Sequence, residues 1–474
     1  MSVPSRSGDS RLTIVVLALA VFAYSALEVM LALALPLIQQ ATGASLPAIA
    51  WAFTGMLLSG AVATPLVGRL ADVRDKRHIL LVLLVALATG TLTSAVATSL
   101  PMLIAGQLVQ GMGLGLIPLS VAIVRDTQPS ERMKSYNGIL LAVPPLAFAV
   151  ALVGSGYIVT KLSYTWIFWP PLALLVLALA AAWLIVPSCP AREAGRVDWL
   201  GAALLAVALS SLLIGVTLST EWGWLSTQFL MLAAVSVIFF CLFTAVELRT
   251  DAPLVNLRLL AGRSVVHASV VSFIVGFGGF SIFVLVPLIV AAPTSTGYGL
   301  GASGTLAGVC LLPMGIFGTL SAPLAGRLER LIGGRAVLAV GAAAVPVSNL
   351  VMLLAPGNAA AIMVAAAISG MASGLGLTQA MNLVVALVPA QHTTSVGGLT
   401  FVIRSVGGTL GGQLAASIVA SSPLPGAPQL SSWHGYVLAF SVFAALCALA
   451  VVLILALPIK DKAAKPEVAG VAAE

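Results

Sequence analysis

The sequence predicts an all-α integral membrane protein, and three observations lead to this fold class. The 474 residues are 60% hydrophobic and 8% charged, with a mean hydropathy of +1.12. Soluble domains carry about 25% charged residues, so this chain has too few charges to cover a surface in water. Its apolar runs match the roughly 20 residues that cross a bilayer as a helix. The net charge of +7 is spread over short basic clusters between these runs, which excludes the single basic face of a nucleic-acid-binding protein.

Fourteen apolar runs are long enough to span a membrane. The first run follows Arg6 and Arg11 and is too long for a signal-peptide core, so we expect it to remain as an uncleaved helix. The polar, alanine-rich tail 460–474 is expected to be disordered. The predicted helices cover residues 12–36, 46–70, 78–98, 101–124, 137–160, 165–187, 198–218, 227–247, 265–291, 301–325, 336–355, 359–388, 394–420 and 433–458.

The distribution of basic residues predicts the orientation of these helices. Lys161 is the only lysine or arginine in the loops on one side of the membrane. The loops on the other side and both termini carry nearly all the rest. Because positively charged loops stay in the cytoplasm, both termini are predicted to be cytoplasmic and the number of spans to be even.

An internal repeat predicts two related bundles. The segment TPLVGRL at 64–70 reappears as APLAGRL at 322–328, and Arg77 matches Arg335 in the same register. Repeats of this kind are typical of secondary transporters. The predicted organisation is a six-helix bundle, two inserted helices, a second six-helix bundle and a tail, covering residues 1–190, 191–260, 261–459 and 460–474.

Several absences narrow the function. The sequence has no G-x-x-x-x-G-K-[ST] phosphate-binding loop, which argues against transport driven by ATP on this chain. Cys189, Cys241, Cys310 and Cys447 are far apart, and the histidines are isolated. We therefore expect no metal and no cofactor. A membrane enzyme acting on lipid would need clustered His, Asp or Glu at one face, so an enzyme is not expected.

The segment Gly68-Arg69-Leu70-Ala71-Asp72-Val73-Arg74-Asp75-Lys76-Arg77 resembles the loop motif G-x-L-a-D-x-x-G-r-k/r of the major facilitator superfamily, with Asp75 in place of the second glycine. The stretches 196–201 and 247–259 resemble the entry to and exit from the inserted helices of its fourteen-helix drug:proton antiporter branch. The resemblance covers nearly the whole chain. It implies the major facilitator fold, with two six-helix bundles and two inserted helices.

By this resemblance, a cytoplasmic gate motif would hold the two bundles together in the outward-facing state. The alternative is a solvated basic loop that serves only topology. The gate motif comprises Gly68, Asp72, Lys76 and Arg77, which Asp126 and Arg132 could join.

Glu28 is the candidate coupling residue, because it is the only acidic residue deep inside a predicted span. A charge at the bilayer centre costs about 2.5–3.5 kcal/mol on insertion scales, so such residues are usually functional. Tyr24 lies one turn earlier on the same helical face. The alternative is a neutral glutamate hydrogen-bonded between helices.

Arg404, the only arginine deep in a span, is predicted either to gate the pathway or to snorkel towards the membrane surface. It lies in the opposite half from Glu28, so direct pairing is possible. Other polar or aromatic residues within spans either line a cavity or pack between helices. They are Gln107, Gln110, Phe273, Phe277, Phe280, Phe283, Asn349, Gln379, Asn382 and Gln413.

The leading hypothesis is proton-coupled efflux of hydrophobic or cationic small molecules by alternating access, with Glu28 as the coupling residue. The partners would be a small-molecule substrate, protons and the lipid bilayer, and the protein would be a monomer in the bacterial inner membrane. The alternative is a metabolite exporter or facilitator without proton coupling. That alternative is favoured by Gln107, which stands where the family usually has an arginine implicated in proton relay. The substrate and any periplasmic adaptor are left open.

Overall fold

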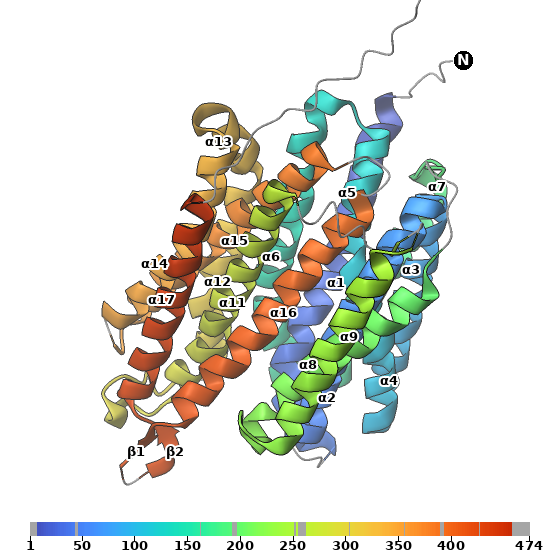
Figure 1. The fold of residues 1–474 in the computed structure, drawn as a ribbon. Helices are drawn as coiled ribbons and strands as arrows, with labels where there is room; N and C mark the ends of the chain where they lie inside the picture. Colours follow the sequence, from blue (N-terminus) through green and yellow to red (C-terminus); the bar gives the residue numbers. More distant parts are fainter. Residues whose placement is uncertain are drawn as a thin grey trace, which may run out of the picture.

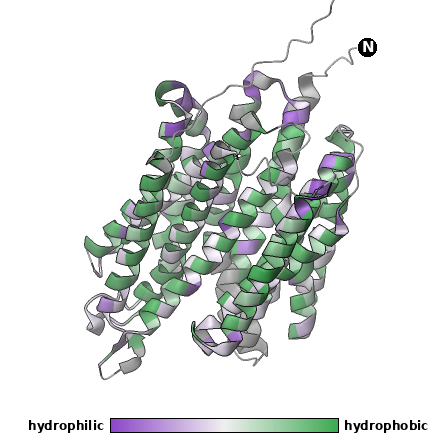
Figure 2. Ribbon diagram, in the orientation of Figure 1, coloured by the Kyte–Doolittle hydropathy of each residue, from purple (hydrophilic) through white to green (hydrophobic). Residues whose placement is uncertain are grey.

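The computed structural model is a bundle of long helices lying side by side (Figure 1). It describes residues 7–42, 46–161, 163–191, 197–250, 253–254, 262–302, 304–354, 356–388, 393–425 and 427–456. The predicted disordered tail 460–474 lies outside these residues. The middle parts of the helices consist mostly of hydrophobic residues, and hydrophilic residues gather towards the helix ends (Figure 2).

The elements fall into three groups along the chain. The N-terminal set is α1 (Ser7–Thr42), α2 (Leu46–Val73), α3 (Lys76–Ala95), α4 (Leu100–Gly111), η1 (Met112–Gly115), α5 (Leu116–Thr127), α6 (Ser130–Lys161), η2 (Tyr164–Ile167) and α7 (Trp169–Ile185). The inserted pair is α8 (Trp199–Trp222) and α9 (Thr227–Glu247). The C-terminal set is α11 (Arg263–Ala291), η3 (Thr294–Thr296), α12 (Gly304–Ser321), η4 (Ala322–Leu324), α13 (Ala325–Ile332), α14 (Gly334–Leu354), α15 (Ala359–Leu387), α16 (Thr393–Ala420), β1 (Pro423–Leu424), β2 (Ala427–Ser431) and α17 (Trp433–Ala456).

In the described residues, thirteen helical segments are long and apolar enough to span a membrane. The 28-residue helix α16 is long enough but is not among them. Its arginine, its glutamine and its many glycines lower its hydropathy. The all-α membrane fold is confirmed, and the total of fourteen spans stays a prediction.

The two ends of the bundle differ. We call the end at which α1 begins and α17 ends the basic end, which is the top in Figure 1. The antiparallel strands β1 and β2 lie at the opposite end, which we call the hairpin end. The sequence did not predict this hairpin. The N-terminal and C-terminal sets pack together where α2 meets α16 and where α6 meets α12.

The span predicted at 101–124 is broken by a 3-10 turn between α4 and α5. This turn is rich in glycine, and neighbouring helices approach closely there. A Cβ on Gly111 would lie 1.9 Å from Ser59 Oγ, and one on Gly113 would lie 2.3 Å from Tyr24 Cδ2. These glycines therefore allow α1 and α2 to pack against η1, as expected of helix-packing glycines.

Candidate functional site

A central cavity lies between the N-terminal and C-terminal helix sets. It encloses about 1050 Å³ of space, including its openings. Its walls come mainly from α1 and α6 on one side and from α11, α12, α15 and α16 on the other. The lining residues are Tyr24, Ser25, Glu28, Val29, Leu114, Ile117, Leu141, Pro144, Pro145, Phe148, Phe280, Phe283, Met314, Gly315, Ser373, Leu377, Phe401 and Arg404.

Glu28 and Arg404 are the two ionisable groups of opposite sign in this cavity. Glu28 comes from α1 and Arg404 from α16, so each helix set contributes one of them. Their charges interact, although no direct ion pair joins these two described side chains. The structure therefore brings the two charged residues that the sequence singled out to the lining of one cavity.

Close helix packing fixes both charged residues. Tyr24, one turn before Glu28, is buried against Gly113 of η1, where a larger residue would clash. The backbone of Arg404 lies against α11, because a Cβ on Gly276 would be 2.1 Å from the Arg404 carbonyl oxygen. The packing of α1 one turn before Glu28, and of α16 at the Arg404 backbone, thus depends on glycines in neighbouring elements.

Aromatic rings form one wall of the cavity. Phe280 and Phe283 of α11 line it together with Phe148 of α6. The rings of Phe148 and Phe283 meet edge to face with their centroids 5.7 Å apart. Phe273 and Phe277, also predicted as cavity residues, are absent from the lining and stack on each other at 5.7 Å. The predicted aromatic stripe is thus divided between the cavity and helix packing.

Several polar residues predicted as possible cavity lining do not line the central cavity. The buried side-chain amides of Gln107 and Gln110 both donate to Ser94 Oγ of α3, at 3.1 and 2.9 Å. Asn349 is buried between α14 and α11, where Ser281 donates to it at 3.0 Å. Each of these three amides is hydrogen-bonded to a serine of a neighbouring helix, and none of them lines the central cavity.

Gln379 and Asn382 are buried on α15 and are likewise absent from the cavity lining. The side chain of Gln379 faces α14 instead: a Cβ on Gly334 would lie 2.7 Å from its Nε2 atom.

The sequence analysis missed the paired prolines of α6. Pro144 and Pro145 lie inside the continuous helix α6, at the cavity wall. The carbonyl of a residue four positions before a proline loses its helical hydrogen bond, so the helix can bend there. Gly315 of α12 fits against this point, since a Cβ on it would lie 2.6 Å from the Pro145 carbonyl oxygen. The signal in the sequence that could have located this point is the pair of prolines inside an apolar run.

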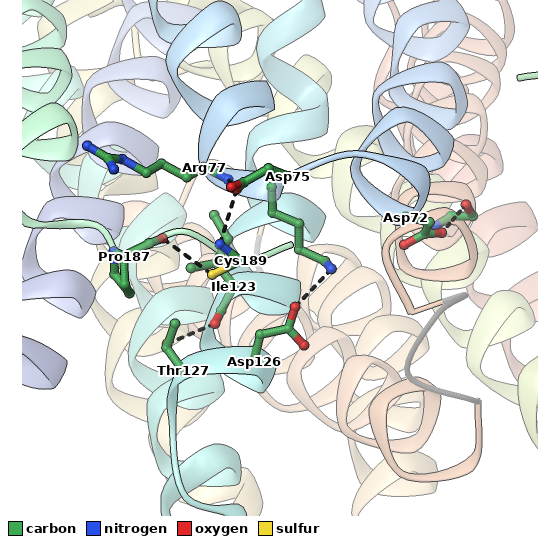
Figure 3. Close-up of polar contacts among 10 residues, drawn as sticks. Asp72, Asp75, Arg77, Ile123, Asp126, Thr127, Pro187 and Cys189 are labelled. Carbon is green, nitrogen blue, oxygen red and sulfur yellow. Dashed lines mark hydrogen bonds and ion pairs between the residues drawn. The ribbon is translucent and has the colours of Figure 1, made fainter. Parts of the chain in front are cut away.

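At the basic end, Asp72 connects the two helix sets. Its carboxylate accepts hydrogen bonds from the Ser395 hydroxyl at 2.5 Å and from the Ser395 N–H at 3.2 Å. Gly68, one turn earlier on α2, touches the same segment of α16, with 3.0 Å from its Cβ position to Ser395 Cα. Asp72 is drawn with this partner at the right of Figure 3, apart from the other labelled contacts.

Among the described contacts, those of the Lys76 and Arg77 side chains lie within the N-terminal set. Lys76 forms a buried ion pair with Asp126 at 2.8 Å. Arg77 donates to the carbonyl oxygen of Trp183 in the last turn of α7. Arg132 is exposed. The partners of Lys76 and Arg77 in this structure thus lie within one set, and their role in joining the two sets stays a prediction.

Arg125 is a contact between the sets that sequence reasoning missed. Its guanidinium, at the end of α5, donates to the carbonyl oxygen of Val388 at 3.1 and 3.2 Å. Val388 follows directly after α15 in the C-terminal set. In the sequence, Arg125 is only one of the basic loop residues that predict the orientation in the membrane. Its contact could not be predicted, because a partner that is a backbone carbonyl leaves no pattern in the side chains.

Asp75, the departure from the family motif, holds the segment that follows α7. Its carboxylate accepts from the Ser188 hydroxyl, from the Cys189 N–H at 3.1 Å and from the Arg77 N–H at 2.8 Å (Figure 3). Partial burial acts to raise the pKa of Asp75, but the hydrogen bonds outweigh it and the pKa is lowered. The ionised carboxylate is thus stabilised where it caps α3 and binds this segment.

The chain matches a family of membrane transporters. The model for the Major Facilitator Superfamily matches residues 17–198 and 198–412. A "Multidrug resistance protein B homolog" of Mycobacterium tuberculosis is 28% identical over 63% of this chain and 55% of its own length. The "Multidrug export protein EmrB" of Escherichia coli is 28% identical over 62% of this chain and 57% of its own length. The chain thus spans about half the length of these curated relatives.

Solved structures share the fold at low sequence identity. The human organic anion transporter MFSD10 (TETRAN) has a TM-score of 0.66 and 15% identity, covering 94% of this chain and 99% of that one. The POT family transporter PepTSo has a TM-score of 0.63 and 14% identity, covering 95% of this chain and 98% of that one. At these identities the likeness concerns the fold alone.

Proposed function

Because the chain belongs to the Major Facilitator Superfamily, we propose that it is a multidrug exporter that couples efflux of hydrophobic or cationic small molecules to proton entry. The predicted major facilitator fold is confirmed, and membership makes the chain a transporter rather than an enzyme. The two multidrug-related relatives support the substrate class. The observation that carries the proposal is the apolar, aromatic-walled central cavity, in which Glu28 is the one carboxyl group among the described lining residues.

The charges in the cavity provide a reason for coupling. With Glu28 ionised, its charge and that of Arg404 balance, and a lipophilic cation gains attraction to the carboxylate. With Glu28 protonated, the cavity keeps the positive charge of Arg404 and repels the same cation. Proton and cationic substrate therefore compete for one group, which is the requirement for exchange.

Alternating access would open the cavity to each side in turn. The hydrogen bonds from Ser395 to Asp72 and from Arg125 to Val388 join the sets at the basic end. We propose that these bonds close that end and break when it opens. By the positive-inside rule, the basic end would face the cytoplasm of a bacterial inner membrane, with both termini on that side.

The second candidate is a metabolite exporter or facilitator without proton coupling. It is favoured by Gln107, whose amide is bound to Ser94 away from the central cavity. This residue therefore offers no proton relay to Glu28. The second candidate predicts substrate flux that is indifferent to a pH gradient.

The deciding experiment measures substrate-dependent proton movement in proteoliposomes with a panel of lipophilic cations and neutral drugs. We expect wild type to exchange protons for a substrate and Glu28→Gln to lose this exchange while still binding substrate. Gln110→Leu, a buried polar change away from the cavity, is the matched control. Equal substrate flux with and without a pH gradient, unchanged by Glu28→Gln, would refute proton coupling and favour the second candidate.

A further inference from the structure

A second cavity lies between the inserted helix α8 and the helices α2, α11 and α16. It encloses about 610 Å³, including its openings. It is lined by Leu57, Leu213, Thr217, Phe280, Val284, Gly408, Thr409, Gly412, Gln413 and Ala416. These residues come from α2, α8, α11 and α16, and α2, α8 and α11 contain segments long and apolar enough to span a membrane.

The second cavity differs in charge from the central one. The ten described residues that line it include no ionisable side chain, whereas Glu28 and Arg404 line the central cavity. Three of the ten carry neutral hydrogen-bonding groups. Thr409 donates to its own helix, to the Ser405 carbonyl at 3.1 Å. Within the described part of the chain, the side-chain amide of Gln413 makes no hydrogen bond. It can therefore both donate a hydrogen bond to a ligand and accept one from it.

Phe280 stands between the two cavities, because its side chain lines both of them. Its ring lies directly against α16, where a Cβ on Gly408 would be 2.9 Å from Phe280 Cδ2. A shift of this one ring would therefore change the separation between the two spaces.

Helix α8 forms the outer wall of the second cavity. Leu205, Leu209 and Leu213 pack with Ala61 of α2 and Val402 of α16 in one buried cluster. At the hairpin end, Trp224 Nε1 donates to Ser417 Oγ of α16 at 3.1 Å. The inserted pair thus closes over the seam between α2 and α16 and completes a space that those helices alone would leave open.

We propose that this second cavity is a binding site for neutral lipophilic molecules that carry one hydroxyl- or amide-type group. The apolar walls would hold the hydrocarbon or ring system, and Gln413 would bind the polar group. The absence of ionisable lining residues disfavours charged ligands, because a charge buried at this depth without a partner is costly. Binding at this site requires neither proton coupling nor export.

Photolabelling tests the site directly on the purified, full-length protein in lipid nanodiscs. The probe is a radiolabelled, neutral long-chain alcohol bearing a diazirine, and the labelled peptides are mapped. We expect saturable labelling of α8 around Thr217 and of α16 around Gln413. The corresponding quaternary ammonium probe should not label these peptides. Labelling that is not saturable, or that falls elsewhere, would overturn the proposal.

Variants separate a real site from general adsorption. Thr217→Trp fills the cavity and should abolish labelling, while Val207→Trp, on an exposed face of the same helix, should leave it unchanged. Gln413→Leu should weaken apparent affinity about fivefold through loss of a hydrogen bond. Each variant is first checked for an unchanged elution profile and unfolding temperature. If Gln413→Leu and Thr217→Trp both fold and label like wild type, the assignment is wrong.

Two further arms keep this test distinct from the proposed function. Glu28→Gln should label like wild type, because its side chain lines only the central cavity. Competition by unlabelled diacylglycerol would identify a membrane lipid as the source, and competition by a neutral drug would identify a transported compound. Either result supports the site.

Discussion

The two copies of the repeated segment, residues 68–77 and 326–335, lie in equivalent places but differ in chemistry. Arg77 donates to the Trp183 carbonyl near the end of α7, and Arg335 donates to the Leu455 carbonyl near the end of α17. In each set, the arginine that ends the repeat thus binds the last helix of that set. An arginine on these carbonyls also complements the negative end of the helix dipole.

The differences lie between these shared points. At the position of Asp72, which binds Ser395 of the other set, the second copy has the exposed Arg330. In place of Asp75 and the buried Lys76, it has Gly333, with φ of 83°, and Gly334. The first copy therefore has a hydrogen-bonded carboxylate and a buried ion pair at positions where the second copy has an exposed arginine and two glycines. The backbone arrangement that both copies share supports the fold. The charged residues of the first copy add the hydrogen bond to Ser395 of the other set and the ion pair to Asp126.

The largest expected effect is at the buried ion pair of the first copy. Asp126→Asn would leave Lys76, which is only 2% exposed, without its counter-charge. We expect a loss of about 3–5 kcal/mol in the free energy of unfolding, because an uncompensated buried charge is strongly destabilising. Thermal unfolding in detergent measures it. The double variant Lys76→Met/Asp126→Asn should recover much of the loss, and Arg330→Gln in the second copy should change little. A loss no greater than that of Arg330→Gln would contradict the comparison.

The next effect concerns the contact between the sets. Asp72→Ala removes two hydrogen bonds from Ser395 to a carboxylate, worth about 1.5–3 kcal/mol each where a charged group takes part. We expect the basic end to open more often, measured as faster thiol labelling of a cysteine introduced at the buried Val388, a position at the same end whose substitution leaves the Ser395 hydroxyl in place. Arg330→Ala, at the matching position of the second copy, is the control and should leave the labelling rate unchanged. Equal rates in Asp72→Ala and wild type would refute the role of Asp72.

A smaller effect should be shared by both copies. A Cβ on Gly68 would lie 3.0 Å from Ser395 Cα, and one on Gly138 of α6 would lie 3.0 Å from Pro323 Cα beside the second copy. Alanine at either position should cost about 1–3 kcal/mol through overpacking against backbone. Unfolding temperatures would measure it, with Gly279→Ala, whose nearest neighbour is at 3.6 Å, as control. A cost at Gly68 alone would break the equivalence of the two interfaces.

The smallest effect is a pH dependence at Asp75. Since its pKa is lowered in the folded protein, its ionised form stabilises the fold above its ordinary value of about 3.9, and this contribution disappears as the pH falls through the lower folded value. The stability difference between wild type and Asp75→Asn should therefore be present at pH 6 and shrink in acid. Unfolding temperatures measured over this range test it. A difference that grows in acid would show the opposite shift.

The sequence predicted the helices well because long apolar runs in a membrane protein have few alternative structures. It also located Glu28 and Arg404, since a charge within an apolar run is visible without a structure. It did not separate Phe280, which lines the cavity, from Phe277, which packs against Phe443 at 4.6 Å. Both lie on one helix, and their roles depend on which neighbour faces each side.

Contacts to backbone atoms were the least predictable. Arg125 binds a carbonyl of Val388, and Asp72 binds a serine far along the chain. Neither partner carries a charge that could suggest the pairing.

The packing of α8 has a consequence for motion. This helix contacts α2 of one set and α16 of the other through the same leucine-rich face. If the sets rotate apart along the α2–α16 seam, α8 cannot follow both, so it must slide over one of them. The inserted pair would then slow that rotation. Smaller side chains at Leu205 and Leu209 would weaken the packing of α8 and make the rotation faster.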